Sequence, residues 1–270
     1  MAFYFIVLPV SANSTHNKFV DVSAGDHFIL ALRDDGSVWT WGGLGCEKYG
    51  VGRDQRDYWI QPTPVQVPIS DVVSIAAGNG FSLALKNDGT VWSWGFNDYG
   101  ELGDGTNVST KKGDLTPVQV SNLSNITQIS AKGLHGIALR KDGTVWSWGD
   151  NFGGSLGDGT FENRWAPVQV LGLVNITSID GGNFAIKNDG TVWTWGLTVL
   201  NSNVTRNDLS SPENPQAIHN IGKPIPYQIP GISNVNSIDV DDGYHHVVFV
   251  KDDGTVWTWG FNEFGQLGDG

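Results

Sequence analysis

The sequence is poor in cysteine, methionine and charge. Of its 270 residues one is cysteine and one is methionine, and 16% are charged, against about 25% in an average soluble protein. The single cysteine, Cys46, excludes an internal disulfide. No apolar run reaches the ~20 residues of a membrane-spanning helix, so the sequence predicts no membrane span.

Basic residues are also scarce. The formal net charge is -12, and no segment is rich in lysine or arginine. Proteins that bind a phosphate backbone usually carry a basic face, so we expect no direct nucleic-acid binding. Many of the acidic residues stand in D-G pairs, where aspartate is typical of tight turns.

A helical period is absent throughout, and an internal repeat takes its place. The segment D-G-x-V-W-x-W-G occurs five times, with D-G pairs at 35–36, 88–89, 142–143, 189–190 and 253–254. The mean spacing of about 54 residues is longer than a tetratricopeptide, ankyrin or typical WD repeat. Repetition on this scale indicates stacked units that share one continuous core.

The second repeat shows four short extended segments. They are P-V-Q-V (64–67), V-V-S-I-A-A (72–77), F-S-L-A-L-K (81–86) and T-V-W-S-W-G (90–95). Alternation with period two, in β-branched and aromatic residues, predicts strands. The D-G pair at 88–89 predicts a type I′ hairpin turn between the last two.

Four strands in each repeat predict an all-β fold, a β-propeller built of four-stranded blades. About five blades are expected, in a single domain over 13–270, as part of a longer propeller. The approximate repeats are 1–42, 43–95, 96–149, 150–196 and 197–260, with a partial unit at 261–270.

Ten of the twelve tryptophans lie in the repeated W-x-W strand, where we expect large aromatic side chains to pack between blades. Stacking on a ligand is the alternative for some of them. They are Trp39, Trp41, Trp92, Trp94, Trp146, Trp148, Trp193, Trp195, Trp257 and Trp259.

Residues 1–12 have two interpretations. They resemble the apolar part of a secretory signal, although no basic segment precedes them. Their L-P-V segment also fits the start of the first repeat. The first interpretation slightly favours an extracellular or cell-envelope location over a cytoplasmic one.

The repeat resembles the regulator of chromosome condensation repeat family over essentially the whole chain. The resemblance rests on G-F-N-D-Y-G-E-L-G-D-G-T (95–106), T-P-V-Q-V (116–120), 129–149 and G-F-N-E-F-G-Q-L-G-D-G (260–270). It implies a propeller, usually of seven blades. Members act as exchange factors for small GTPases, chromatin-binding proteins, plant ultraviolet sensors or secreted bacterial β-lactamase inhibitors.

Two segments depart from the repeat, 44–62 and 197–223, and both follow a W-x-W-G strand. Equivalent connections leave a propeller on one side, so we expect both to decorate one face. They contain tyrosine, tryptophan and arginine, the usual anchors of protein interfaces. The predicted partner-binding residues are Tyr49, Arg53, Arg56, Tyr58, Trp59, Arg206 and His219.

No residue pattern indicates an enzyme, a metal or a cofactor. The G-G-S-L-G segment around Ser155 matches a nucleophile elbow, but Glu101 and Gln266 occupy the same repeat position. The position of His135 and His246 holds phenylalanine in other repeats, which indicates packing.

The leading hypothesis is a non-catalytic module that presents loops from a rigid propeller to a protein partner. It would be exchange-factor-like, inhibitor-like or a scaffold. The alternative is a carbohydrate- or small-ligand-binding propeller that uses aromatic residues outside the repeated hairpin, namely Tyr58, Trp59, Tyr99, Trp165, Phe261 and Phe264.

Overall fold

A computed structural model describes most of the chain. The described residues are 18–46, 58–109, 114–197, 222–240, 246–260, 262 and 264–270, with the backbone alone for 44–46 and 58–59. The predictions for residues 1–12 therefore lie outside the described residues.

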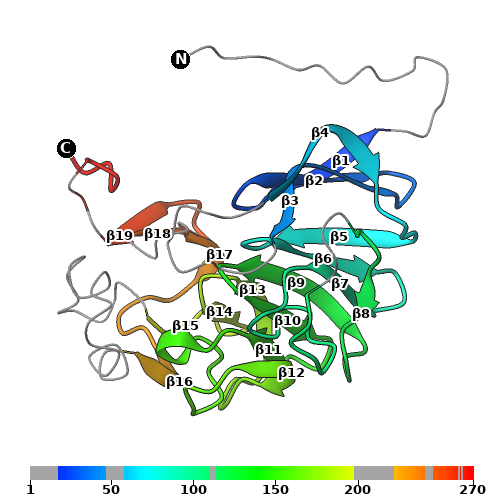
Figure 1. Cartoon of the computed structure of the whole chain (residues 1–270). Helices are drawn as coiled ribbons and strands as arrows, with labels where there is room; N and C mark the ends of the chain where they lie inside the picture. Colours follow the sequence, from blue (N-terminus) through cyan, green and yellow to red (C-terminus); the bar gives the residue numbers. More distant parts are fainter. Residues whose placement is uncertain are drawn as a thin grey trace.

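The described chain is all-β, as predicted from the repeat, and its strands form five antiparallel sheets that follow one another along the sequence (Figure 1). We call these sheets blades 1 to 5. In the described residues the one helical element is a 3₁₀ turn, η1 (Phe152–Gly154). Blade 1 contains β1 (Phe19–Ala24), β2 (Phe28–Arg33), β3 (Val38–Cys46) and β4 (Tyr58–Gln66). Blade 2 contains β5 (Val72–Ala77), β6 (Phe81–Lys86), β7 (Val91–Gly95) and β8 (Val118–Gln119), and blade 3 contains β9 (Ile126–Lys132), β10 (His135–Arg140), β11 (Val145–Gly149) and β12 (Arg164–Gln169). Blade 4 contains β13 (Ile176–Asp180), β14 (Phe184–Lys187), β15 (Val192–Gly196) and β16 (Lys223–Gln228), and blade 5 contains β17 (Val235–Val240), β18 (His246–Lys251) and β19 (Val256–Gly260).

The blades are offset from the sequence repeats by one strand. The P-V-Q-V segment at 64–67, which opens the second repeat, pairs through β4 with the W-x-W strand before it. Blade 2 therefore runs from β5 to β8. The first strands of neighbouring blades contact one another, from β1 to β5, β9, β13 and β17, so they lie innermost.

The D-G turns lie where the repeat predicts them, but the predicted turn type is wrong. A type I′ turn needs positive φ at both central residues. In the turn after β6 only Gly89 has positive φ, at +79°, and its N–H donates to the Lys86 carbonyl over 3.0 Å. This is a type I turn closed by a glycine bulge. Asp88 accepts from the Thr90 N–H at 2.9 Å and hydroxyl at 2.6 Å, so it caps the turn from a negative φ.

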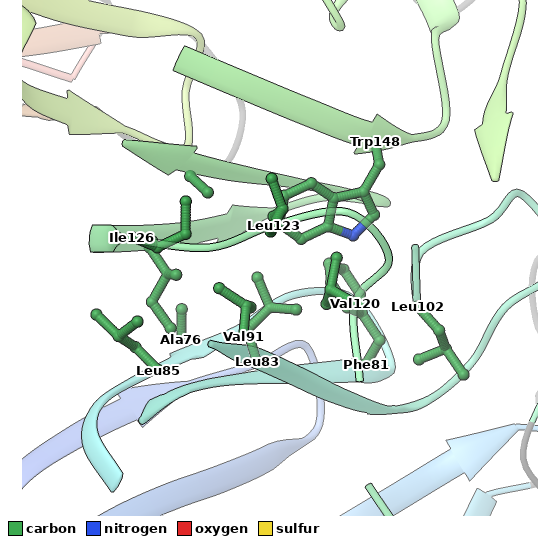
Figure 2. Close-up of a cluster of buried hydrophobic side chains, with 12 residues drawn as sticks. Ala76, Phe81, Leu83, Leu85, Val91, Leu102, Val120, Leu123, Ile126 and Trp148 are labelled. Carbon is green, nitrogen blue, oxygen red and sulfur yellow. The ribbon is translucent and has the colours of Figure 1, made fainter. Parts of the chain in front are cut away.

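The core lies between blades. Trp148 of β11 belongs to blade 3, yet it packs among Phe81, Leu83 and Val91 of blade 2 (Figure 2). Its side chain is fully buried. Val145 of the same strand packs in the next cluster, between blades 3 and 4. The two faces of each W-x-W strand thus serve two different blade interfaces.

The G-x-L-G segment that follows a W-x-W strand closes over the next blade. The Trp148 indole N–H donates to the Glu101 carbonyl over 2.8 Å, and Trp195 donates to the Ser155 carbonyl over 2.9 Å. A Cβ on Gly103 would come within 2.8 Å of the Trp148 ring. Glycine is required there because the turn backbone lies directly on the indole.

Blade 1 departs from the others at its outer hairpin. We expected the divergent segment 44–62 to begin after the W-x-W-G strand. Instead β3 continues to Cys46, and β4 begins at Tyr58, which pairs with it. Trp59 pairs with Leu44. β3 therefore extends beyond the W-x-W-G motif, whereas β7 and β11 end at its glycine, Gly95 and Gly149.

Candidate interaction face

The two sides of the propeller differ in their connections. Strands in each blade are antiparallel, so the connections between first and second strands, and those between third and fourth strands, lie on one side. We call this side the loop face. The D-G turns and the links between blades lie on the opposite side, the turn face.

Buried asparagines hold the loops of blades 2 and 3. The Asn97 side-chain oxygen accepts from the Leu102 N–H at 2.9 Å, and its amide donates to the Thr106 and Val108 carbonyls at 3.2 Å. Asn151 accepts in the same way from Leu156 at 2.9 Å. These loops are therefore fixed by internal hydrogen bonds, which lowers the entropy cost of presenting them to a partner.

Acidic side chains dominate the described part of the loop face. Arg164 is paired with Asp158 over 2.7 Å, and Lys132 donates to the Val240 carbonyl of blade 5. These two cations are thus engaged within the protein. Acidic groups such as these attract basic partners. The acidic residues are Asp26, Asp98, Asp104, Asp114, Asp150, Asp158, Glu162 and Asp180.

Two carboxyl groups of this face are shielded from solvent, Glu101 completely and Asp150 in part. Burial raises the pKa of Glu101 to about 8, and the charges of Asp150 and Asp98 add to the effect. Burial also raises the pKa of Asp150 to about 6. One Glu101 oxygen accepts from the Tyr99 N–H at 2.9 Å, while the other has no hydrogen-bond partner in the structure. At neutral pH Glu101 therefore carries a proton.

His135 lies at the boundary of blades 3 and 4. Its Nε2 lies 2.9 Å from the Asn183 side-chain oxygen. Burial lowers its pKa to about 4, although the bonds to Asn183 and to the Gly181 backbone oppose the shift. The imidazole is therefore neutral at pH 7, in line with the packing role that the sequence indicates.

We expect His135 to make the protein acid-sensitive. The folded pKa lies below the ordinary value of 6.5, so the unfolded state binds more protons between about pH 6.5 and 4. Stability present above pH 6.5 is lost as the pH falls toward 4, by about 3 kcal/mol. Phenylalanine stands at this position in blades 1 and 2, as Phe28 and Phe81. His135→Phe should remove this part of the pH dependence in urea titrations from pH 4 to 7. An unchanged slope would contradict the assignment.

Most of the predicted partner-binding residues lie outside the described part of the chain. These are Tyr49, Arg53, Arg56, Arg206 and His219. Of Tyr58 and Trp59 the structure describes the backbone, in β4. The two divergent connections follow β3 and β15, both third strands, and so they leave the propeller on the loop face.

The repeated tryptophans fall into distinct environments. The second tryptophan is buried in blades 2, 3 and 4, as Trp94, Trp148 and Trp195. The first tryptophan of the motif is half-buried in blades 1 to 4. In blades 1 to 3 a cation lies over its ring; the Arg140 guanidinium, for example, is 4.3 Å from the centroid of the Trp146 ring. In blade 5, Trp257 is 55% and Trp259 is 40% exposed.

The residues beneath the indoles explain this difference. In blades 1 to 4 the residue paired with the first tryptophan is alanine, as Ala84 is for Trp92. In blade 3, Gly136 lies beneath Trp148. Blade 5 has Phe249 and Val247 at these positions, and both are buried against blade 4. They fill the space that the indoles occupy elsewhere. The sequence signal that was missed is the phenylalanine and valine of blade 5 at positions that hold alanine and glycine in blade 3.

Other candidates are scattered. The Ser155 hydroxyl donates to the Asp150 carbonyl at 3.0 Å, and the described residues hold no cluster of three His, Cys, Asp or Glu side chains that could bind a metal. Tyr99 packs on Phe96, whereas Trp165 and Phe264 are exposed. Phe261 lies outside the described residues. No helix among the described residues is long and apolar enough to cross a membrane.

Comparisons with known proteins agree with the architecture. A family model described as RCC1-like domain matches residues 6–270. Protein pim1 of Schizosaccharomyces pombe is 29% identical over 95% of this chain and 49% of its own length. The E3 ubiquitin-protein ligase HERC2 of Mus musculus is 31% identical over 94% of this chain and 5% of its own length. The chain thus spans half or less of these curated relatives.

Solved structures show the same fold. The crystal structure of Prp20p from Saccharomyces cerevisiae, described with its binding to Gsp1p and histones, has 26% identity and a TM-score of 0.70 over 93% of this chain and 60% of that one. Yeast RCC1 (Prp20) bound to Kap60 has 25% identity and a TM-score of 0.73, over 95% and 59%.

Proposed function

Because the chain belongs to the RCC1-like domain family, we propose that it is a protein-interaction module whose loop face binds a partner with a basic surface. The related Prp20p binds Gsp1p and histones, and protein binding is the property that a rigid propeller supports without catalytic groups of its own.

The contrast between the two faces carries this proposal. The turn face repeats one D-G turn five times, each with glycine at positive φ. The loop face instead follows no single repeated turn, and its exposed carboxylates among the described residues include Asp98, Asp114 and Glu162. A scaffold that is uniform on one side and varied on the other is typical of recognition by loops.

We propose exchange-factor-like action on a small GTPase as the first activity to test, ahead of inhibitor-like or purely scaffolding roles. The contact residues proposed from sequence remain Tyr49, Arg53, Arg56, Tyr58, Trp59, Arg206 and His219. They flank the acidic loops along the chain, so an interface there would combine aromatic anchors with complementary charge.

The test measures binding of Gsp1p and of histones, and release of a fluorescent nucleotide from Gsp1p. Reversing two exposed loop-face charges, Asp98→Lys with Glu162→Lys, should weaken binding about 10-fold or more at low salt, because steering between opposite charges is lost. The matched control reverses two exposed turn-face charges, Asp34→Lys with Asp252→Lys, and should change binding less than about 2-fold.

A third protein carries Trp59→Ala, Arg56→Ala and a short Gly-Ser linker in place of 200–220. It should lose binding if the divergent connections supply the anchors. Failure of the unaltered protein to bind either probe, or equal loss in both charge-reversed proteins, would contradict the proposal.

A further inference from the structure

The side chain of Glu101 is buried where the loop of blade 2 closes on blade 3. In the described part of the chain it is the only acidic residue that is fully buried. One of its carboxyl oxygens accepts from the Tyr99 N–H at 2.9 Å, and the other, Oε1, has no hydrogen-bond partner in the structure. A buried carboxylate is costly unless its charge is paired and its oxygens are hydrogen-bonded. A positive charge brought near Glu101 would therefore favour its ionised form.

Packing does not require an acid at this position of the repeat. Ser155 holds the position in blade 3, and Gln266 holds it in blade 5. The backbone contact is kept nonetheless. The Glu101 carbonyl accepts from the Trp148 indole N–H at 2.8 Å, and the Ser155 carbonyl accepts from Trp195 at 2.9 Å. The carboxyl group of Glu101 is thus an addition to a shared loop structure.

Two carboxylates from neighbouring blades act on Glu101. Asp98 belongs to the same loop of blade 2, where it is exposed and accepts from the Ser109 hydroxyl at 3.1 Å. Asp150 follows β11 of blade 3 and is shielded in part. Burial is the main cause that raises the pKa of Glu101 to about 8, and the charges of Asp150 and Asp98 add to it. A cation bound beside these two carboxylates would offset their charges and so lower the Glu101 pKa.

The other ionisable groups described around this loop do not bring such a cation. Arg164 begins β12 beside Gly100, and its guanidinium is paired with Asp158 over 2.7 Å. The pKa of Tyr99 is raised by burial and by the acidic charges around it, so its phenol is neutral at pH 8. His135 on β10 is neutral at pH 7, because burial lowers its pKa to about 4. Among the described groups no unpaired cation is thus placed beside Glu101, and a partner would have to bring one.

We propose that the loop face releases a proton when it binds a basic partner: a lysine or arginine side chain of the partner binds beside Asp98 and Asp150, and the proton of Glu101 passes to solvent. This inference rests on the loop-face binding proposed above and adds its regulation by pH. Because the partner's cation favours the ionised carboxylate, the affinity rises with pH as long as the free protein still holds that proton. Asp150, whose pKa is raised by burial to about 6, adds to the rise in the lower part of the range. The loop face therefore binds basic partners more tightly at pH 8 than at pH 6.

The test is isothermal titration calorimetry at low salt with an N-acetylated deca-lysine peptide, which has no group that titrates between pH 6 and 8, and with histones as the second probe. The affinity of the parent protein for the peptide should rise about 3- to 10-fold from pH 6 to pH 8. At pH 7 the heats measured in phosphate and in Tris buffer should differ, because the buffer takes up the released proton. Glu101→Gln has no such proton and should reduce the rise to about 2-fold or less, the part left to Asp150. Glu162→Gln makes the same change at an exposed carboxylate of the loop face and should keep the rise.

A further variant excludes a cation of the chain itself. Lys111 and Lys112 lie outside the described residues, and Lys111→Gln with Lys112→Gln should keep the rise with pH. Its loss in that variant would assign the proton linkage to these lysines and overturn the inference. Parallel pH profiles for the parent and Glu101→Gln, or equal heats in the two buffers, would also overturn it while leaving loop-face binding intact. Failure of both probes to bind at every pH would contradict the proposed function as well.

Discussion

Replacing Trp148 with alanine should lower the free energy of unfolding by about 3–5 kcal/mol, the range for large buried aromatic residues. The side chain is fully buried between blades 2 and 3. Its loss leaves a cavity beside Phe81 and Val120, and it leaves the Glu101 carbonyl without its 2.8 Å donor. Urea denaturation, compared at constant m-value, measures the change.

The matched control is Trp257→Ala, in the same repeat motif but 55% exposed. It loses the stacking of Lys251 and should cost about 1 kcal/mol or less. Equal costs at the two positions would mean that blade 5 packs against blade 4 as closely as blade 3 packs against blade 2.

Glu101→Gln should stabilise the protein by about 4 kcal/mol at pH 8 and leave it nearly unchanged at pH 4.5. Burial raises the folded pKa of Glu101 from 4.5 to about 8, so the folded state binds more protons than the unfolded state between these values. Stability is complete below pH 4.5 and is lost as the pH rises through 8, at about 1.4 kcal/mol per unit.

Glutamine suits the site because Gln266 holds the same position in blade 5. Its side-chain oxygen accepts from the Phe264 N–H at 2.9 Å, just as Glu101 accepts from Tyr99. Urea unfolding at pH 5, 6, 7 and 8 gives the slope for each protein. His135 contributes equally to both proteins. Asp150 is coupled to Glu101, because its charge raises the Glu101 pKa, so the difference in slope reports Glu101 together with this coupling. Parallel slopes would show that Glu101 is ionised and solvated in the folded state.

The strands follow from the sequence because their determinants are local. Alternation in T-V-W-S-W-G and the turn chemistry of D-G act within a few residues, and repetition multiplies the signal five times. The turn type was wrong for a physical reason: aspartate gains more from capping Thr90 with a negative φ than from the positive φ that a type I′ turn requires.

The candidate sites were less accessible to sequence reasoning. The sequence places the two divergent connections on one face, since both follow third strands. It treats the tryptophans alike, because their motif is identical. Their burial depends on the residue paired with each tryptophan on the neighbouring strand: Ala84 in blade 2, Gly136 in blade 3 and Phe249 in blade 5. Such pairs are set by the register between strands that lie several residues apart in the sequence.

By itself, then, the sequence determined the repeat, the all-β architecture, the family resemblance and the turn positions, since each depends on short-range pattern. Tertiary structure decided which residues of one motif are buried. It gave Glu101 a raised pKa, because a loop of blade 2 closes over the tryptophan of blade 3. It left Trp259 exposed, in the one described blade where valine and phenylalanine are paired with the two tryptophans. Burial and desolvation arise between blades, and adjacency of blades is a property of the folded chain.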